Sequence, residues 1–342
     1  MTVRTEPRPA ESVQLESLSS TKTKELVELA RVSLGESPIF RTPEFWNWKH
    51  QHSPFGESLG FVARAATGLA GMRVFMRWTW YSQGAAVPCV RAVDTATHPD
   101  WRRRGLFKQL TKRGLEDAAE NGVRAVFNTP NEKSLPGYLK LGWRPLGRIP
   151  LWVKPLRPLR ALARLARQRL GGHAFATNPA PLRPAAAALQ ESNSAAFGAG
   201  FTGETRFHTL PTPEYLRWRY ADPPGLRYGA AAGARALVIY RLRWRRGLLE
   251  LSLCEVLAND DGSSQDEAVS IVRELAANTN ADYAVAIGAS GTPESACFRR
   301  SGFRETSRLG PTLVVRPVAG GDLGGLVDLD SWRLSIGAME LF

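Results

Sequence analysis

The sequence has few of the residues that build disulfide frameworks and metal sites. Its 342 residues include three cysteines and five histidines. Cys89, Cys254 and Cys297 are widely and irregularly spaced, a pattern that favours neither a disulfide framework nor a zinc site. Long apolar runs are also absent, since no stretch approaches the roughly 20 apolar residues that cross a bilayer and no signal-peptide core is seen. We therefore expect a cytoplasmic protein without a metal and without a transmembrane segment.

Acidic residues are in deficit as well. The chain has 32 Asp and Glu against 45 Lys and Arg, which gives a formal net charge of +13. An excess of this size favours anionic partners, among them CoA, a nucleotide-linked sugar, nucleic acid or an anionic membrane surface, and does not choose among them. With 43% apolar residues the chain can form a real core, and its length predicts two domains.

The most informative stretch is residues 90–143. A β-type run that ends at Thr97 is followed by a basic loop and then by an amphipathic helix predicted from Leu106 to Asn121. Backbone N–H groups at a helix start bind anions, Gly105 lets the backbone approach a ligand closely, and the arginines of 102–104 add donors for phosphate. This arrangement suits a pyrophosphate. The alternative is a plain strand-to-helix turn with a solvated basic edge.

A second motif follows, with Asn131 seven residues before Tyr138. Together the two motifs resemble the GNAT acyltransferase superfamily, in which a strand, loop and helix hold the pyrophosphate of acetyl-CoA. The first motif is matched by Arg102, Arg103, Arg104, Gly105, Leu106 and Phe107, with Phe107 in place of the usual small residue, and the second by Asn131, Tyr138, Lys140, Gly142 and Trp143. The resemblance implies that residues 102–107 and Asn131 bind acetyl-CoA as the acyl donor, with no metal.

Parts of these patterns recur in the second half of the chain. Thr212-Pro213-Glu214-Tyr215 repeats Thr42-Pro43-Glu44-Phe45 at a separation of 170 residues (212 − 42), and Phe298 to Arg304 repeats Tyr138 to Arg144 at 160 (298 − 138). We therefore predict an α/β fold (α+β, mixed sheet) of two tandem GNAT-like domains, each a central mixed sheet flanked by helices. The loop 258–264 is acidic and lacks the Arg-x-x-Gly pattern, so the second half is expected to be degenerate.

The expected organisation has five parts. They are a disordered tail (1–11), a GNAT domain with the acyl-CoA site (12–155), a basic helical linker (156–172), a degenerate GNAT-like domain (173–317) and a C-terminal docking tail (318–342). On a helical wheel the apolar residues of the linker gather opposite its arginines. Residues 156–170 are expected either to contact an anionic surface or to bridge the halves with a solvated basic face.

The GNAT resemblance also implies catalytic roles. A backbone N–H near Thr97 would polarise the thioester carbonyl, and Tyr138 would protonate the leaving thiolate, unless Tyr138 is a core tyrosine. Asp94 is a weak candidate for the base because strand alternation would turn it away from Thr97. Similar tandem acetyltransferases of the enhanced-intracellular-survival type return their C-terminus to the active site, which implies the Phe342 carboxylate as base with Glu340 as substitute. The alternative is a tail that only covers the sheet of the second half.

These expectations lead to one main functional hypothesis. It is an acyl-CoA-dependent N-acyltransferase that acetylates an amine of a small polar acceptor, with an amino sugar of cell-surface glycan metabolism as the favoured case. One alternative is a Fem-like aminoacyl-tRNA-dependent transferase, which the net charge of +13 would suit. The other is a non-catalytic acyl-CoA-binding module. The Arg-x-x-Gly loop favours CoA, no specific nucleic acid partner is expected, and the oligomeric state is left open.

Overall fold

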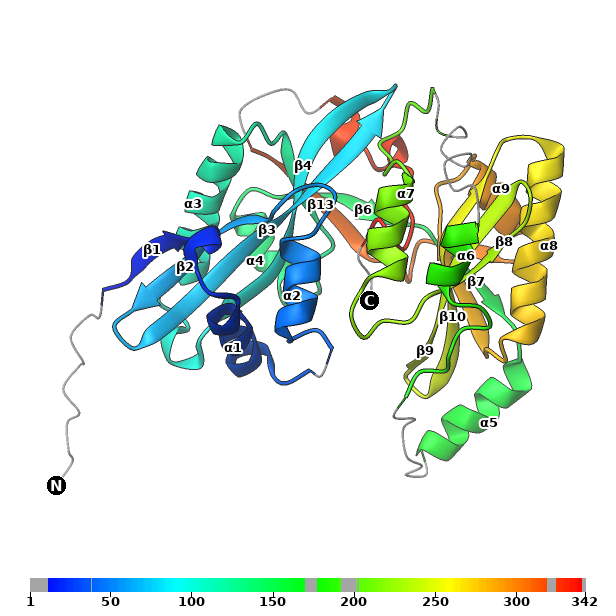
Figure 1. The fold of residues 1–342 in the computed structure, drawn as a ribbon, viewed down its shortest axis with the longest axis horizontal. Helices are drawn as coiled ribbons and strands as arrows, with labels where there is room; N and C mark the ends of the chain where they lie inside the picture. The colour runs from blue at the N-terminus through cyan, green and yellow to red at the C-terminus, as the bar shows by residue number, and fades with distance from the viewer. Residues whose placement is uncertain are drawn as a thin grey trace. The chain divides into compact units, whose positions relative to one another are not determined.

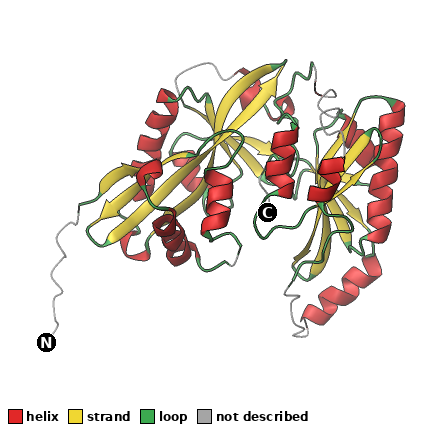
Figure 2. Ribbon diagram, viewed as in Figure 1, coloured by secondary structure: helices red, strands yellow, loops and turns green. Residues whose placement is uncertain are grey.

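The computed structural model describes residues 12–37, 39–169, 177–191, 201, 203–318 and 324–339. The tail expected over residues 1–11, Glu340 and Phe342 lie outside the described residues. Two mixed sheets, of seven and six strands, are flanked by helices (Figure 2). The predicted fold class is confirmed.

The chain divides into two compact units. The first unit comprises Met1–Trp78, Pro88–Asn128 and Pro317–Gly321, and the second comprises Thr79–Val87, Thr129–Arg316 and Asp322–Phe342. The boundary expected after residue 155 does not coincide with this division, because residues 129–155 fall in the second unit. Each unit is described below by itself.

The first unit has a sheet with strand neighbours in the order β1-β2-β3-β4-β5. Its elements are β1 (Gln14–Ser17), α1 (Thr23–Leu34), α2 (Pro43–His50), β2 (Leu59–Ala65), β3 (Gly68–Ser82), β4 (Ala85–Thr97), the short helical turn η2 (Pro99–Trp101), α3 (Leu106–Glu120) and β5 (Ala125–Asn128). β1 and β2 pair antiparallel, as do β2 and β3, whereas β4 and β5 are parallel and are joined through α3 (Figure 1).

Helix α3 is held on its sheet by one apolar face. Leu106 and Leu110 are buried in a cluster with Phe61 and Ala70, and each such leucine contributes about 2 kcal/mol of burial free energy. Gly114 sits where a Cβ would lie 2.4 Å from the ring of Phe75, so a side chain at this position would push the helix off the sheet. These contacts fix the position at which the helix begins, and therefore the position of its first N–H groups.

The second unit contains the six-stranded sheet, with the order β12-β7-β11-β10-β9-β8. Its elements are α4 (Leu135–Lys140), β6 (Arg144–Arg148), β7 (Leu151–Pro155), α5 (Pro158–Arg169), α6 (Ala185–Glu191), α7 (Pro213–Leu216), the helical turn η4 (Arg217–Ala221), β8 (Gly229–Ala232), β9 (Ala236–Arg245), β10 (Leu248–Ala258), α8 (Gly262–Asn278), β11 (Tyr283–Ile287), α9 (Pro293–Arg300), β12 (Arg304–Thr306) and β13 (Thr312–Pro317). β10 and β11 are parallel and joined through α8, which repeats the β4-α3-β5 arrangement of the first unit (Figure 1).

Two strands pair outside their own repeat. β7 directly follows the second GNAT-like motif in sequence, yet it pairs antiparallel with β11 and β12, which belong to the second repeat. Conversely, β13 at the end of the second repeat pairs antiparallel with β6. Each sequence repeat therefore supplies one strand to the partner repeat.

Helix α5 lies within the predicted linker, but its orientation differs from the expected one. Arg160 and Arg164 both pair with Asp282, whose side chain has no exposed surface, and Arg157 donates to the carbonyls of Ala277 and Ala281. Leu159 is 83% exposed. The expectation of a solvated arginine face is wrong for these three arginines, because a buried carboxylate and the carbonyls around it need cationic donors.

Candidate active site

The loop between β4 and α3 has a conformation suited to binding an anion. Arg103 and Gly105 both adopt left-handed backbone angles, with φ values of +65° and +78°. Gly105 is the residue immediately before the helix, and it has no side chain to cap the helix start. The first N–H groups of an α-helix have no partner within the helix, so this end of α3 presents donors toward a ligand.

These residues surround one cavity of the first unit. Its volume is about 340 Å³, and it is lined by Thr97, Trp101, Arg102, Arg103 and residues 105–108. An added Cβ on Gly105 would meet no heavy atom within 4 Å, so the glycine leaves open space on this side of the loop. The structure thus brings Thr97 and the predicted loop residues other than Arg104 together around a single cavity.

The three arginines of the loop differ in their contacts. Arg102 donates to the Ser33 carbonyl at the end of α1, at 3.1 Å. The guanidinium of Arg104 lies over the Trp101 ring, 4.5 Å from its centroid. Arg103 is exposed and lines the cavity. The first two contacts fix the loop, and Arg103 and Lys108 add positive charge at the cavity wall, which suits a pyrophosphate.

Phe107 departs from the family motif, and the structure shows where its ring lies. The guanidinium of Arg73, a buried residue of β3, is 5.2 Å from the centroid of the Phe107 ring. Phe107 also lines the cavity. Its backbone N–H stays at the helix start, while its ring adds an apolar surface to the cavity wall.

Asn131 and Tyr138 belong to the second unit. The Asn131 side-chain oxygen accepts hydrogen bonds from the backbone N–H of Ser134 (2.9 Å) and from its hydroxyl (3.1 Å), just before α4. Tyr138 is buried, and its ring packs edge-on against Trp143 with 5.2 Å between centroids. Asn131 therefore shapes the turn that positions α4, and the roles in cofactor binding and catalysis assigned to Asn131 and Tyr138 stay predictions.

A polar cluster on β4 was not predicted as a unit. The Asp94 carboxylate accepts from Lys49 Nζ at 2.6 Å and lies 3.0 Å from His50 Nε2, while His50 Nδ1 lies 2.9 Å from the Ser58 hydroxyl. Asp94 has a φ of +41°, so the strand is irregular here and simple alternation between Asp94 and Thr97 does not hold. The repeated Thr-Pro-Glu segment could have signalled this cluster, because Lys49 and His50 lie at its end.

The charges of this cluster decide what Asp94 can do. Burial would raise the pKa of Asp94, but the nearby Lys49 and His50 outweigh burial and hold this pKa well below its usual range. A carboxylate that stays ionised and paired is poorly suited to accept a proton from an ammonium group near neutral pH. Asp94 instead joins α2 to β4.

The equivalent helix start in the second unit is closed by a side chain. Asp261 precedes α8, and its carboxylate accepts from the Ser264 backbone N–H at 2.8 Å and from the Ser264 hydroxyl at 2.6 Å. A carboxylate at this place satisfies donors that a phosphate would use and repels a second anion. This geometry agrees with the expectation of a degenerate second half.

Within the described ranges, no group of three or more His, Cys, Asp or Glu side chains is arranged to hold a metal ion. None of the helices that the structure describes is long and apolar enough to span a bilayer.

The comparison with protein families gives one match. Residues 14–146 match the family model described as an acetyltransferase (GNAT) domain. This range contains β1 through β5 and the start of β6, including the loop before α3 and both sequence motifs. No curated protein sequence matches the chain.

Solved structures with a similar fold extend over most of the chain. A conserved protein of unknown function from Enterococcus faecalis V583 has a TM-score of 0.62 at 13% identity, covering 90% of this chain and 73% of that one. A GCN5-related N-acetyltransferase from Kribbella flavida has a TM-score of 0.57 at 16% identity, covering 90% and 71%. The N-myristoyltransferase of Saccharomyces cerevisiae, solved with bound myristoyl-CoA, has a TM-score of 0.54 at 13% identity, covering 92% and 80%. At these identities the likeness concerns the fold.

Proposed function

We infer that this chain, which carries a GNAT acetyltransferase domain over residues 14–146, uses that domain as an acyl-CoA-dependent N-acyltransferase. The observation that carries the inference is the start of α3, where Gly105 leaves the first N–H groups of the helix uncapped beside a cavity of about 340 Å³. Arg103 and Lys108 at the cavity wall supply the charge that a pyrophosphate requires.

The finer proposal concerns the substrates. We propose acetyl-CoA as the donor and a primary amine of a small polar molecule as the acceptor, with an amino sugar of cell-surface glycan metabolism as the favoured case. The description of the matching family as acetyltransferases supports the donor. The net charge of +13 supports an anionic substrate such as CoA.

The proposed mechanism assigns each step to a residue. The α3 start and Arg103 hold the pyrophosphate, which places the thioester beside the end of β4. The backbone N–H near Thr97 donates to the thioester oxygen as the amine nitrogen attacks the carbonyl carbon. The carbon–sulfur bond then breaks, and the Tyr138 hydroxyl gives its proton to the leaving sulfur. In this proposal the terminal carboxylate of Phe342 takes the proton from the amine.

Binding and turnover measured together test the function. The purified full-length protein should bind acetyl-CoA saturably in calorimetry, with one molecule per chain. It should release free CoA thiol, detected with a thiol reagent, when glucosamine or another amine is added. Binding of tRNA in place of acetyl-CoA would favour a Fem-like transferase. Acetyl-CoA binding without release of thiol for any of a panel of amines would favour a non-catalytic binding module.

A further inference from the structure

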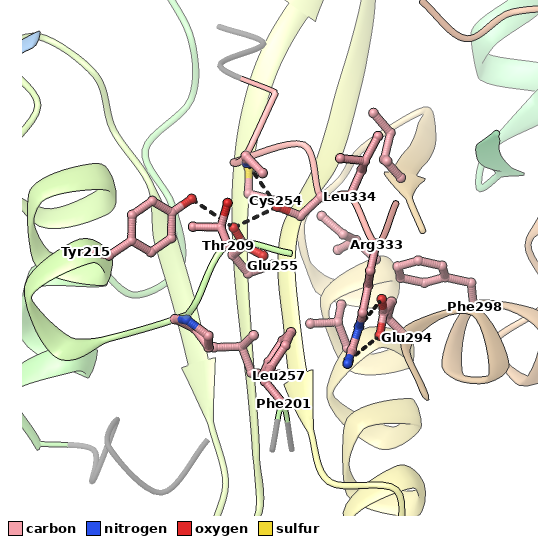
Figure 3. Close-up of a pocket in the computed structure, with 16 residues that line it drawn as sticks. Phe201, Thr209, Tyr215, Cys254, Glu255, Leu257, Glu294, Phe298, Arg333 and Leu334 are labelled. Atoms are coloured by element: carbon pink, nitrogen blue, oxygen red, sulfur yellow. Dashed lines mark hydrogen bonds and ion pairs between the residues drawn. The ribbon is translucent and has the colours of Figure 1, made fainter. Parts of the chain in front are cut away.

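The second unit contains a small, partly enclosed pocket with a buried carboxylate in its wall (Figure 3). Its volume is about 30 Å³, and its polar wall includes Thr209, Tyr215, Glu255, Glu294, Arg333 and Ser335. We call it the Glu255 pocket. A volume of this size holds one or two water molecules or the polar end of a small ligand.

Glu255 is fixed at an irregular point of β10. The register with β9 shifts between Leu253 and Glu255, which is a β-bulge. The Glu255 side chain therefore enters the pocket from the strand. Only 9% of the residue is exposed, so its carboxylate depends on protein groups or on a ligand for hydrogen bonds.

The two oxygens of this carboxylate have different surroundings. Oε1 accepts three hydrogen bonds, from the hydroxyls of Tyr220 (2.6 Å), Ser335 (2.8 Å) and Tyr215 (3.3 Å). Oε2 receives no hydrogen bond from any residue that the structure describes. A carboxylate oxygen can accept two hydrogen bonds, so Oε2 is an acceptor in the wall of the pocket that a ligand can use.

The nearby cations are engaged elsewhere. Arg333 pairs with Glu294 at 2.9 Å and with Glu204 at 3.1 Å (Figure 3 draws the Glu294 pair). Arg219 donates to the Gly337 carbonyl at 3.2 Å and to the Tyr228 hydroxyl at 2.8 Å. Among the described residues no cation forms an ion pair with Glu255. The lining of the pocket contains two carboxylates, Glu255 and Glu294, and one guanidinium, Arg333.

We propose that the Glu255 pocket binds the ammonium group of a small primary amine or of a flexible chain that ends in one. An ammonium group is compact and carries three N–H donors, and its size fits a pocket of about 30 Å³. Its positive charge would give the Glu255 carboxylate an ion-pair partner. The three hydroxyls on Oε1 hold the carboxylate in place, which leaves Oε2 directed to the ligand. This binding does not depend on acyl transfer, so the two proposals succeed or fail separately.

The titration of Glu255 provides a second signature. Burial raises its pKa to about 7, although hydrogen bonds from Tyr220 and Ser335 and the charge of Arg219 act in the opposite direction. The other groups of the cluster ionise well away from this pH, since burial raises the pKa of Tyr215 and of Tyr220 and raises that of Cys254 to about 12. The ammonium group binds the ionised carboxylate, so affinity should fall as the pH falls through 7.

The test is a titration of the ¹⁵N-labelled full-length protein with ethylammonium chloride at pH 8 and constant ionic strength. We expect saturable shifts of the backbone N–H signals next to Glu255, such as that of Val256. Tetramethylammonium, which has the same charge and no N–H donors, should produce no saturable shift. Glu255→Gln, which keeps the size and removes the charge, should lower the affinity at least about tenfold. Glu274→Gln, at an exposed position of α8 in the same unit, is the matched control and should leave the affinity unchanged.

Three outcomes would overturn the proposal. They are the absence of saturation by ethylammonium, an equal response to tetramethylammonium, and an unchanged affinity in folded Glu255→Gln. If Glu255→Gln does not fold, the affinity of the wild-type protein for ethylammonium is measured as a function of pH, and this dependence tests the proposal. An affinity that is flat between pH 5.5 and 8.5 would exclude Glu255 as the binding group, and a loss of affinity with a midpoint near 7 would support it.

Discussion

The two repeats of the chain start the equivalent helix in different ways. α3 begins after Gly105, which has no side chain, and α8 begins after Asp261, whose carboxylate caps the helix. Both helices connect two parallel strands. The difference teaches that an anion site in this fold depends on one position, at which the chain either leaves the helix donors open or satisfies them itself.

The two repeats also differ in the residues that contact a carboxylate. His50 and Tyr220 are 170 residues apart (220 − 50) and close the same repeated segment, and each contacts a carboxylate on the strand before the repeated helix. Asp94 has Lys49 and His50 as partners, whereas Glu255 has three hydroxyls. Cationic partners keep the first carboxylate ionised, whereas burial raises the pKa of the second to about 7 despite its hydroxyl donors and the charge of Arg219.

The largest expected effect comes from giving the α3 start a side chain. Gly105→Val should abolish acetyl-CoA binding, because a β-branched side chain would enter the space beside the loop and a φ of +78° strains any L-residue. Calorimetry with acetyl-CoA measures the effect.

A control must distinguish the effect of backbone strain at Gly105 from a direct effect on acetyl-CoA binding. Gly122, just after the end of α3, has a φ of +71° and equally open surroundings, so Gly105→Ala and Gly122→Ala form a matched pair. We expect both to lower the melting temperature and only Gly105→Ala to weaken binding. Equal affinities for the two variants would contradict the cofactor assignment.

The next change makes the first repeat resemble the second, where Phe298 occupies the position of Tyr138. Tyr138→Phe should lower kcat roughly 100-fold or more with little change in acetyl-CoA affinity, because the proton donor is lost and the ring is kept. The aromatic contact with Trp143 does not require the hydroxyl, so the melting temperature serves as the control for folding. An unchanged kcat would make Tyr138 a core residue.

The local elements could be predicted from the sequence, because their signals lie within a few residues. The helix predicted from Leu106 to Asn121 is observed as Leu106–Glu120, since Gly105 and Gly122 mark its ends. The repeat of Thr-Pro-Glu likewise corresponds to two helices, α2 and α7, whose Thr42 and Thr212 hydroxyls cap them.

Non-local pairing could not be predicted in this way. β7 pairs with β11, and β13 pairs with β6. The alternation of apolar and polar residues cannot predict these pairings, because a strand has the same periodicity whichever sheet it joins. The direction of the α5 arginines depends on Asp282, more than 100 residues away. The hydroxyl donors to Glu255 likewise come from separate segments, which meet only in the folded unit.

The two carboxylates should give opposite dependences of stability on pH. The pKa of Glu255 is raised from 4.5 to about 7, so the folded state binds the proton more tightly and loses about 3 kcal/mol of stability as the pH rises across that window. The pKa of Asp94 is lowered from 3.8, so its contribution is present above that value and is lost as the pH falls below it.

Unfolding in urea as a function of pH measures both contributions. Relative to the wild type, Glu255→Gln should gain stability as the pH rises from 4.5 to 7, and Asp94→Asn should show its deficit above pH 4 and lose it in acid. Parallel curves for the two variants would mean that their environments do not differ as described.

The smallest effect is expected at the α8 start. Asp261→Gly makes the second repeat resemble the first at this position, because it removes the capping carboxylate and leaves the N–H of Ser264 without that acceptor. The variant should have a slightly lower melting temperature, since the lost cap is exposed and water replaces it. It should still bind one acetyl-CoA per chain with unchanged affinity, because the second loop has no arginine in residues 258–264 and Asp260 still repels a pyrophosphate. A second acetyl-CoA bound by this variant would show that Asp261 alone closes the site. Two molecules bound by the wild type would contradict the degenerate assignment altogether.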